Sequence, residues 1–493
     1  MVVSLITKSN FLSYLHCPKK LWLEKYSKEK AQPRTPYQEY ISNEGLDVEK
    51  LAKSSFGVSV HIPKELSPQE RAIQTGEAIK NGAKIIFEAS FIVDGLFAAI
   101  DVLELKENGC NLIEIKATND YRKKRKKYLQ DVAFQYEVVE RAGLTVNDVS
   151  LMYLNKSAEW PVNVDQSFVL DSVIDKLQTY LKGFDGIINS AKKMLSCNEE
   201  PKCTISRFCK QDHGCPFKAY CWKDINDYTI FDVDMGYRHR DKLTKQEVVY
   251  LNEVPENADL TNKEKDVISR ARQKKVYMDK VAIKSILDDL EFPLYFLDFE
   301  TFGPAIPLFK GMHPYQKIPF QFSCHVLNEN GELTHDEFLH TDFSDPREFL
   351  VASLLDQVKE KGNIVVYHKS FEAGVINSLA ELFGDEVKEK LVELVPRLFD
   401  LRDIFIDHYK HFKFRGSTSI KAVGPVMTPD VSYKSLQIQK GDQASIEWLN
   451  MVKSTSKKQN DSIAKDLREY CRMDTYAMYA IYQKLCDEIT NKN

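Results

Sequence analysis

A pattern of three apolar, strand-length runs followed by a helix and a further strand occurs twice in this chain. The first begins with IIFEASFIV at residue 85 and the second with LYFLDFET at residue 294. Strands that alternate with helical segments are typical of α/β domains. The length of 493 residues also exceeds what one hydrophobic core usually supports. We therefore expect two α/β domains.

The first domain is expected to cover residues 1–222. Its patterns predict amphipathic helices over 7–60, then the three strands, a helix over 128–142, a strand over 149–155 and a helix over 166–195. Four cysteines lie at the end of this stretch.

Residues 223–290 have helical patterning with scattered charge and no catalytic constellation, so we expect a helical connector there. The second domain, 291–493, is predicted to contain three strands, a helix from Pro346, a strand over 363–368 and helices through to Lys484. This order resembles that of ribonuclease H-like folds, which have a mixed sheet flanked by helices.

The charge and the N-terminal sequence exclude some classes of partner. A formal net charge of −4 provides no global field for a polyanion, so nucleic-acid binding must rely on local basic patches or metal ions. The N-terminus lacks a signal peptide, and no stretch approaches the roughly 18 uninterrupted apolar residues of a membrane span. We expect a cytoplasmic protein with no membrane contact. Because no GxxxxGK[ST] loop is present, motor activity would need a partner such as a helicase.

Polar side chains interrupt the second and third strand-like runs of the first domain. Asp101 follows the apolar residues LFAAI, and Glu114 and Lys116 lie two residues apart in NLIEIKA. Alternate strand residues point the same way, so Glu114 and Lys116 share one face. Two carboxylates with a nearby ammonium group suit Mg²⁺ or Mn²⁺ binding and phosphodiester hydrolysis. A solvated cross-strand pair is the alternative.

The string D-x12-E-x-K resembles the signature of PD-(D/E)XK nucleases, and its surroundings resemble the RecB-like branch, which includes the CRISPR-adaptation exonucleases. In that branch a glutamine on the following helix lies near the site, and Gln135 matches it, with Asp131 one turn earlier. The branch also has an acidic or histidine residue before the strands. Glu49 is the best match for that residue, and Glu88 is another candidate.

The cysteines form the second constellation. Cys203, Cys209, Cys215 and Cys221 recur with five intervening residues, unlike the CxxC pairs of structural zinc sites, and metal ligation explains them better than disulfides. LHCPKKLWL and CPFKAYCW resemble the cysteine segments of iron–sulfur RecB-like nucleases. That resemblance implies a structural [4Fe–4S] cluster held by Cys17, Cys209, Cys215 and Cys221, with Cys203 as the spare. A zinc site on the four clustered cysteines and unligated buried cysteines are the alternatives.

A third constellation lies in the second domain. FLDFET places Asp298 and Glu300 on one side of an apolar strand, YHKSFEAGVI places Glu372 at the start of a helix, and EYCRMDTYA places Tyr470 and Asp474 on one helical face. Charges on a buried strand need a partner, and a divalent metal ion supplies one. Helix caps and pairs with surface lysines are the alternative roles for these acids.

The order DxE, mid-domain acid and YxxxD resembles the three motifs of DEDDy exonucleases of the ribonuclease H-like superfamily. The resemblance implies 3′–5′ hydrolysis with two metal ions held by the four carboxylates and an attacking water positioned by Tyr470. The middle motif normally carries aspartate, whereas this chain has Glu372. The longer side chain keeps the charge but shifts the metal, so this departure from the motif implies weakened or altered activity.

Two basic features are candidate nucleic-acid contacts. The run that includes Arg122, Lys123, Lys124 and Arg125 lies between the strand of the first site and its glutamine helix, where it could grip a phosphate backbone. A solvated face is the alternative. Lys421, in GSTSIKAVGPVM, is a candidate phosphate contact of the second domain.

The whole arrangement resembles a bacterial family in which a RecB-like, cluster-bearing nuclease precedes a DEDD-like domain, and the resemblance spans nearly all 493 residues. We therefore expect a metal-dependent DNA nuclease, an exonuclease acting on single-stranded DNA or free ends in repair or defence, together with other proteins of those processes. An RNA exonuclease and a non-catalytic nucleic-acid-binding or assembly protein with degenerate sites are the alternatives.

Overall fold

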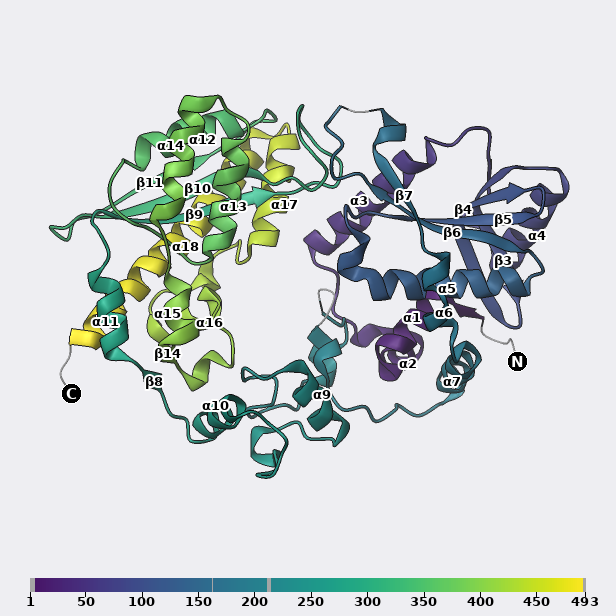
Figure 1. Ribbon diagram of the computed structural model, residues 1–493, viewed down its shortest axis with the longest axis horizontal. Helices are drawn as coiled ribbons and strands as arrows, with labels where there is room; N and C mark the ends of the chain where they lie inside the picture. Colours follow the sequence, from purple (N-terminus) through teal and green to yellow (C-terminus); the bar gives the residue numbers. More distant parts are fainter. Residues whose placement is uncertain (1–4, 162, 211–213, 491–493) are drawn as a thin grey trace. The chain divides into compact units, whose positions relative to one another are not determined.

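The computed structural model describes residues 5–161, 163–210 and 214–490 (Figure 1). Two mixed sheets, each flanked by helices, organise this part of the chain. The α/β class predicted from the two repeated patterns is therefore confirmed. Within the described ranges, every helix is too short or too polar to cross a membrane bilayer.

The chain divides into two compact units. Unit 1 contains Met1–Ile225 and Pro304–Gln316, and unit 2 contains Asn226–Gly303 and Lys317–Asn493. Most of the segment expected to be a connector thus packs with unit 2. A short excursion of the chain after the strand that carries Asp298 belongs to unit 1.

A seven-stranded mixed sheet forms the centre of unit 1. Six strands follow the order β2-β3-β4-β5-β6-β7, and β1 pairs in parallel with β4. Neighbouring strands are antiparallel except for the parallel pairs β2/β3 and β5/β6. The strands are β1 (Ile6–Thr7), β2 (Val60–His61), β3 (Ile85–Val93), β4 (Leu96–Lys106), β5 (Gly109–Lys116), β6 (Val146–Leu154) and β7 (Phe168–Ser172).

Helices cover both faces of this sheet. Leu112 packs with α1, α5 and α7 in the larger apolar core, whereas Ile113 and Ile115 pack with α3 on the other face. The period of two in β5 therefore places Glu114 and Lys116 on the α1/α5 face. The helices of unit 1 are α1 (Lys8–His16), α2 (Pro18–Tyr26), α3 (Pro36–Lys53), α4 (Pro68–Lys80), α5 (Arg125–Arg141), α6 (Gln178–Leu181), α7 (Phe184–Ser196) and α8 (Lys218–Cys221).

The strands predicted before residue 155 are confirmed, but the continuous helix predicted over 166–195 is wrong. Its first part is strand β7, which pairs with β6, and Gly183 has a φ of +74° between α6 and α7. Pairing with an available sheet edge outweighs a helical pattern in a short segment, because each backbone group then gains a partner.

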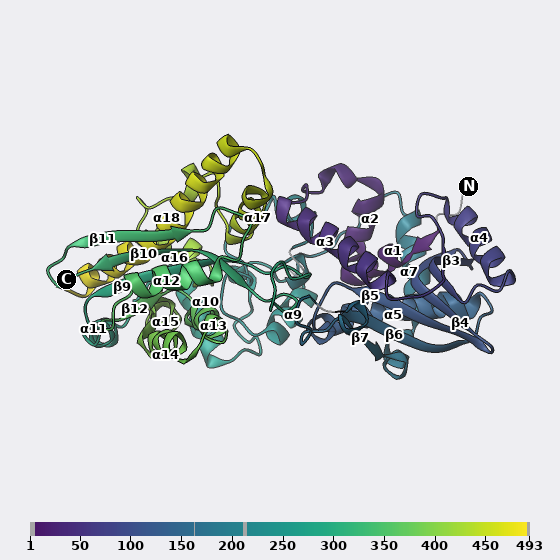
Figure 2. The same ribbon diagram turned by 90° about the horizontal axis from the view of Figure 1, so that it is seen from above.

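Unit 2 contains a five-stranded mixed sheet of order β11-β10-β9-β12-β13. β10 runs antiparallel to β9 and β11, whereas β9, β12 and β13 are parallel. Figure 2 shows β11, β10, β9 and β12 side by side in this order. Its strands are β9 (Leu294–Phe302), β10 (Ile318–Leu327), β11 (Leu333–Leu339), β12 (Ile364–Val366) and β13 (Leu398–Asp400).

Alternate residues of β9 enter two different cores. Tyr295, Leu297 and Phe299 pack with α12, α13 and α14, whereas Leu294 and Phe296 pack with α11, α15, α16 and α18. Asp298 and Glu300 continue the second series and face α18. The helices named here are α11 (Lys280–Asp288), α12 (Arg347–Gln357), α13 (Lys369–Ala380), α14 (Asp385–Leu394), α15 (Leu401–Asp407), α16 (Ile420–Met427) and α18 (Lys457–Thr490).

The remaining elements of unit 2 are short. Strand β8, in the segment expected to be a connector, pairs with β14. This two-stranded ribbon joins the segment to the rest of unit 2. The elements are α9 (Tyr237–Lys245), α10 (Asn262–Arg272), β8 (Tyr277–Met278), β14 (Tyr409–Lys410) and α17 (Gly441–Lys453).

Candidate metal centre

Three carboxylates of unit 2 converge at one point. One oxygen each from Asp298, Glu300 and Asp474 lies within 4.8 Å of the others. No other trio of acidic, histidine or cysteine side chains in the described part of the chain is this compact. Carboxylate oxygens are the ligands that Mg²⁺ and Mn²⁺ prefer, so this trio is a candidate site for either ion.

Two elements position the three acids. Asp298 and Glu300 lie two residues apart on β9, and the helix α18 packs across β9 and β10 on the face to which they point. Figures 1 and 2 show this long helix in yellow along the sheet. Tyr470 and Asp474 occupy its buried face one turn apart. The arrangement predicted from the DxE and YxxxD motifs is thus present as a spatial cluster.

The electrostatics of the cluster are unfavourable without a cation. Burial, together with repulsion from Asp474, raises the pKa of Glu300 to about 8. Burial and the same neighbour also raise the pKa of Asp298, and burial raises that of Asp474. Desolvated carboxylates that repel one another favour neutralisation, which a divalent ion provides.

Glu372 lies beside this group but outside the compact trio. It occupies the first turn of α13, is 3% exposed, and electrostatically raises the pKa of Asp298. Its Oε2 atom is buried with no hydrogen-bond partner among the described residues. Burial raises the pKa of Glu372 to about 8, although Lys317 opposes the shift. A buried carboxylate oxygen without a partner fits a ligand position that a metal ion would fill.

Two tyrosines and a lysine complete the surroundings of Asp474. The Tyr433 hydroxyl donates to Asp474 Oδ1 at 2.7 Å, and Lys421 Nζ donates to the Tyr470 hydroxyl at 2.9 Å. Lys421 also donates to the carbonyl of Gln439 at 2.7 Å. Lys421 is therefore held against the tyrosines and the acidic cluster. Tyr433 was missed by the motif comparison, because it lies in a three-residue 3-10 helix, Tyr433–Ser435, without a recognisable sequence pattern.

A second charged site lies in unit 1. Lys116 Nζ is 2.6 Å from both Glu114 Oε1 and Asp131 Oδ2, and Gln135 Nε2 donates to Glu114 Oε2 at 2.6 Å and to Asp131 Oδ1 at 3.0 Å. The predicted strand and helix residues are thus brought together. Lys8, which the motif comparison missed, also contacts both acids, at 2.8 Å and 3.0 Å.

Asp101 lies next to this site. Its Oδ2 accepts a hydrogen bond from the backbone N–H of Ile115 at 2.8 Å, and burial together with repulsion from Glu114 raises its pKa to about 7. Glu49 and Glu88 belong to a different group, since both pair with Lys53, at 2.6 and 2.7 Å. Neither of the two candidate acids is therefore seen in contact with the Lys116 site.

The cysteines of both ends of unit 1 gather in one region. Cys17 forms a hydrogen bond with Cys203, and Cys221 interacts electrostatically with Cys209, Cys215 and Cys17. The hydrogen bond from Cys17 lowers the pKa of Cys203 to about 6. Cys203, assigned as the spare, thus lies beside a predicted ligand. This region contains five thiols, whereas a four-thiolate cluster takes four. The fourth ligand beside Cys209, Cys215 and Cys221 can therefore be either Cys17 or Cys203.

Lys19 and Trp22 show how α2 is held beside these cysteines. Trp22 packs on Phe217, and its Nε1 atom donates to the carbonyl of Cys197 at 2.9 Å. Lys19 interacts electrostatically with Cys203 and Cys221. A cation near thiols stabilises the thiolate form that metal binding requires.

The basic run is exposed. Arg122, Lys123, Lys124 and Arg125 lie on the short turn before α5 and on its first residue, so they precede the helix that carries Gln135. Arg122 pairs with Asp120 at 2.8 Å.

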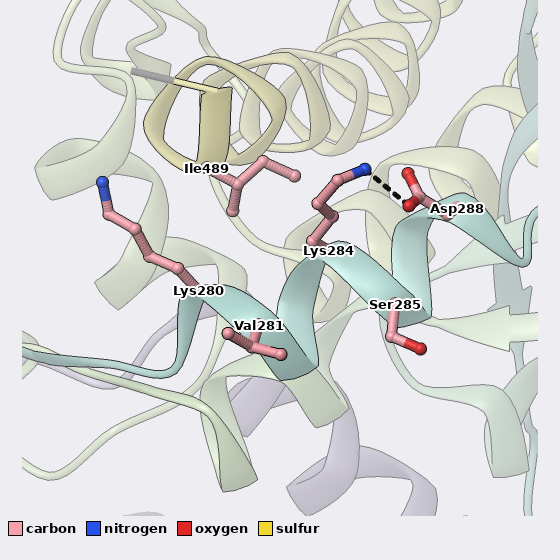
Figure 3. A pocket seen from close by; sticks show the side chains of 6 residues that line it. All are labelled: Lys280, Val281, Lys284, Ser285, Asp288 and Ile489. Atoms are coloured by element: carbon pink, nitrogen blue, oxygen red, sulfur yellow. Dashed lines mark hydrogen bonds and ion pairs between the residues drawn. The ribbon is translucent and has the colours of Figure 1, made fainter. Parts of the chain in front are cut away.

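A separate pocket lies between α11 and the end of α18. Figure 3 shows Lys284 reaching toward Asp288, with which it pairs at 2.6 Å, and Ile489 of α18 nearby. None of its lining residues belongs to the acidic cluster. This pocket therefore adds nothing to the candidate metal centre.

Comparison with known proteins gives a similarity without an assigned activity. Residues 295–419 match the model of a family described as "Domain of unknown function (DUF2779)". The matched segment contains Asp298, Glu300 and Glu372 but ends before Tyr470 and Asp474.

Three curated relatives come from the mycoplasmas. The chain is 29% identical to "Uncharacterized protein MG366 homolog" of Mycoplasma pneumoniae over 42% of this chain and 34% of the relative. It is 27% identical to "Uncharacterized protein MG366" of Mycoplasma genitalium and 26% identical to "Uncharacterized protein UU173" of Ureaplasma parvum, each over 40% of this chain and 32% of the relative. The chain thus spans about a third of the length of these relatives.

Proposed function

We propose that this chain is a metal-dependent DNA nuclease with one hydrolytic site in each unit. The observation that carries the proposal is the convergence of Asp298, Glu300 and Asp474, whose ligand atoms lie within 4.8 Å of one another. The order of the unit 2 sheet, with a central DxE strand beside an antiparallel and a parallel neighbour, supports a ribonuclease H-like fold. The arrangement supports a 3′–5′ exonuclease of the DEDDy type.

In unit 2 the four acids would hold divalent metal ions, which activate water and stabilise the leaving oxygen when bound. Tyr433 fixes Asp474 through its hydroxyl. Tyr470 presents its hydroxyl next to the same acid, where it can position an attacking water. Lys421 places a positive charge beside both rings, which favours the approach of a phosphate.

In unit 1 the contacts of Glu114, Lys116 and Gln135 support a PD-(D/E)XK site of the RecB-like type. Asp101 and Glu114 would hold Mg²⁺ or Mn²⁺, and Lys116 would orient water or balance the charge of a phosphate. The exposed basic run before α5 supports binding of a nucleic-acid backbone there. Single strands or free ends of DNA are the proposed substrate, in repair or defence.

The cysteine region supports a [4Fe–4S] cluster better than zinc. Four sulfurs at 2.3 Å from one zinc ion would lie about 3.8 Å apart. No trio of cysteine sulfurs within the described residues lies inside 4.8 Å, so the thiols are more widely spread than one tetrahedral ion requires. In a [4Fe–4S] cluster each of the four thiolates binds a different iron atom, so the cysteine sulfurs lie farther apart than around a single ion.

The test is degradation of end-labelled single- and double-stranded DNA by the full chain with Mn²⁺ or Mg²⁺. Asp474→Ala should remove the unit 2 activity and Lys116→Ala the unit 1 activity. Each substitution should lower the rate of its site more than about 100-fold, because changing residues that only hydrogen-bond to metal ligands already costs about 10–100-fold in activity. The matched controls are the exposed residues Asp461 on α18 and Lys106 on β4, also changed to alanine.

Degradation that survives the double substitution Lys116→Ala/Asp474→Ala would show that neither site is the source of activity. Matched RNA tested in parallel separates a DNA nuclease from an RNA exonuclease. Metal-independent binding with no turnover under any divalent ion would support the non-catalytic alternative instead.

A further inference from the structure

Two lysines, not one, share the carboxylates of the unit 1 site. Lys8 Nζ lies 2.8 Å from Glu114 Oε1 and 3.0 Å from Asp131 Oδ1. Lys116 Nζ contacts the same two carboxylates at 2.6 Å each. Glu114 and Asp131 are nearly buried, with side chains 4% and 8% exposed, whereas Lys8 keeps 26% of its side chain exposed. Two ammonium groups therefore neutralise two carboxylates at the point where the motif comparison expects a metal ion.

The position of Lys8 is fixed by its neighbours on both sides. Ile6 pairs with Leu96 of β4, and Thr7 forms a capping box with Asn10 at the start of α1. One turn later, Phe11 is 1% exposed and packs on Phe134 of α5, with ring centroids 5.3 Å apart. The backbone of Lys8 is thus anchored to β4, the strand that carries Asp101, and to α5, the helix that carries Asp131. Only the four-carbon side chain is free to change direction.

The two sites of the chain differ in how the negative charges of their carboxylates are neutralised. In unit 2, the carboxylates repel one another, and the Oε2 atom of Glu372 has no hydrogen-bond partner in the described ranges of the chain. In unit 1, Lys8 and Lys116 already occupy the acids, and no trio of ligand atoms closes within 4.8 Å among its described residues. Lys116 and Gln135 each bridge Glu114 and Asp131, so Lys8 is not needed to hold these two acids together.

We propose that Lys8 is a second active-site lysine of unit 1, which occupies Glu114 and Asp131 in the metal-free protein and is displaced when a divalent cation binds. This inference rests on the proposed nuclease function of unit 1. The displaced ammonium group remains tethered at the site and partly exposed, and it is then available to a substrate phosphate. Such a lysine limits metal binding until a phosphate compensates its charge.

The test uses the full chain with Asp298→Asn and Asp474→Asn, so that unit 2 neither binds metal nor hydrolyses DNA. Into this parent we place Lys8→Met, which keeps the length without the charge, Lys8→Arg, which keeps the charge, and the control Lys106→Met on the exposed end of β4. Mn²⁺ affinity is measured by calorimetric titration, folding by thermal melting, and hydrolysis with end-labelled DNA.

Lys8→Met should bind Mn²⁺ about tenfold more tightly than the parent, because a competing positive charge is removed. Lys8→Arg should stay within about threefold of the parent, and Lys106→Met should not differ. If Lys8 only forms a structural ion pair with Glu114 and Asp131, a folded Lys8→Met protein should bind Mn²⁺ as well as the parent or less well. Either that result or an absence of Mn²⁺ binding in both proteins would overturn the inference.

Hydrolysis separates this inference from the function on which it rests. The parent should degrade DNA, and Lys8→Met should be slowed about 10- to 100-fold in kcat despite its tighter metal binding, because the phosphate loses a charged contact. A parent that binds Mn²⁺ but hydrolyses nothing would reject the nuclease function of unit 1, while the Mn²⁺ affinities would still decide the role of Lys8. Equal rates in both proteins would overturn the phosphate contact.

Discussion

Buried glutamates of this chain have very different partners. Glu88 contacts Lys53 and Arg71, Glu264 accepts several hydrogen bonds, and Glu372 keeps one carboxylate oxygen unpartnered in the described structure. Removing a carboxylate from water costs several kcal/mol unless another charge or donor compensates. The first two are accounted for by structure alone, whereas Glu372 is not. The unpartnered acid is therefore the one that indicates a ligand.

We expect Glu372→Gln to stabilise the metal-free chain and to weaken its metal binding. Because burial raises the pKa of Glu372 to about 8, its carboxyl costs stability at neutral pH, and an amide removes this cost, which should raise the free energy of unfolding in EDTA by about 1–2 kcal/mol. Mn²⁺ affinity of unit 2 should fall about tenfold or more, as measured by titration of a protein with Asp101→Asn and Glu114→Gln, which remove the proposed metal ligands of unit 1. Glu381→Gln, at the exposed end of the same helix, is the control. A destabilised Glu372→Gln protein in EDTA would contradict the metal-ligand interpretation.

At the scale of elements, the segment 226–290 is ordered by its own local contacts and is joined to the rest of unit 2 at close approaches. Glu264 belongs to the capping box of α10 with Thr261 and also accepts from the N–H of Gly236 at 2.8 Å. Gly416 lies beside the backbone of Asp232 and Val233, with a φ of +71°. The approach of Gly416, together with the pairing of β8 and β14, explains why the segment expected to be a connector packs as part of the unit.

The stability supplied by Glu264 should depend on pH. Burial alone would raise its pKa, but hydrogen bonds with His239, Thr261 and Gly236 outweigh burial and lower the pKa to about 2. A depressed carboxyl pKa stabilises the fold above the ordinary value of 4.5, and this contribution is lost as pH falls toward 2. The difference in free energy of unfolding between wild type and Glu264→Gln should therefore shrink from pH 5 to pH 2, as urea denaturation can measure. A difference independent of pH would refute this.

Gly416→Ala should destabilise unit 2 more than a glycine substitution at an open turn. A Cβ atom at residue 416 would lie 2.9 Å from backbone atoms of Asp232 and Val233, and the φ of +71° is unfavourable for alanine. Gly331, in the turn between β10 and β11, has a φ of +87° but nothing within 4 Å of such a Cβ. We expect a cost of about 1 kcal/mol for Gly331→Ala and clearly more for Gly416→Ala, by chemical denaturation. Equal costs would show that the contact with 232–233 is unimportant.

At the scale of the whole molecule, each unit is closed by parts of the chain that are distant in sequence. Unit 1 brings Cys17 to the cysteines after residue 200 and includes the excursion Pro304–Gln316. In unit 2 the strand with Asp298 meets the helix with Asp474. Closing such long loops costs entropy that a metal or cluster can offset.

Cys17→Ser should lower the iron content of an anaerobic preparation and destabilise unit 1. The substitution removes one proposed thiolate and the link between α2 and the cysteines after residue 200, at a cost of about 2–5 kcal/mol, as for the loss of a native cross-link. Iron analysis and thermal melting measure the two effects. The exposed Cys197, changed to serine, is the control. Unchanged iron in Cys17→Ser would exclude Cys17 as a ligand.

The patterns along the chain predicted much of the architecture and most members of the two acidic groups. The two-residue period of FLDFET and NLIEIKA is enough to place Asp298 with Glu300 and Glu114 with Lys116, because strand geometry depends only on local backbone. Tyr433 and Lys8 could not be found in this way. Each contacts its acid only after distant elements have packed.

What the sequence determined by itself is the local chemistry: where most of the longer strands and helices form, which of their faces carry charge, and which residue types suit metal ions. Only the tertiary structure decided which of the buried carboxylates are neutralised by other side chains of the protein. It left one oxygen of Glu372 without a hydrogen-bond partner among the residues that the structure describes, but it gave Glu114 and Asp131 two lysines. It also placed most of the segment 223–290 within unit 2. The reason is physical, since the free energy of a buried charge depends on every group that folding brings within a few ångströms of it.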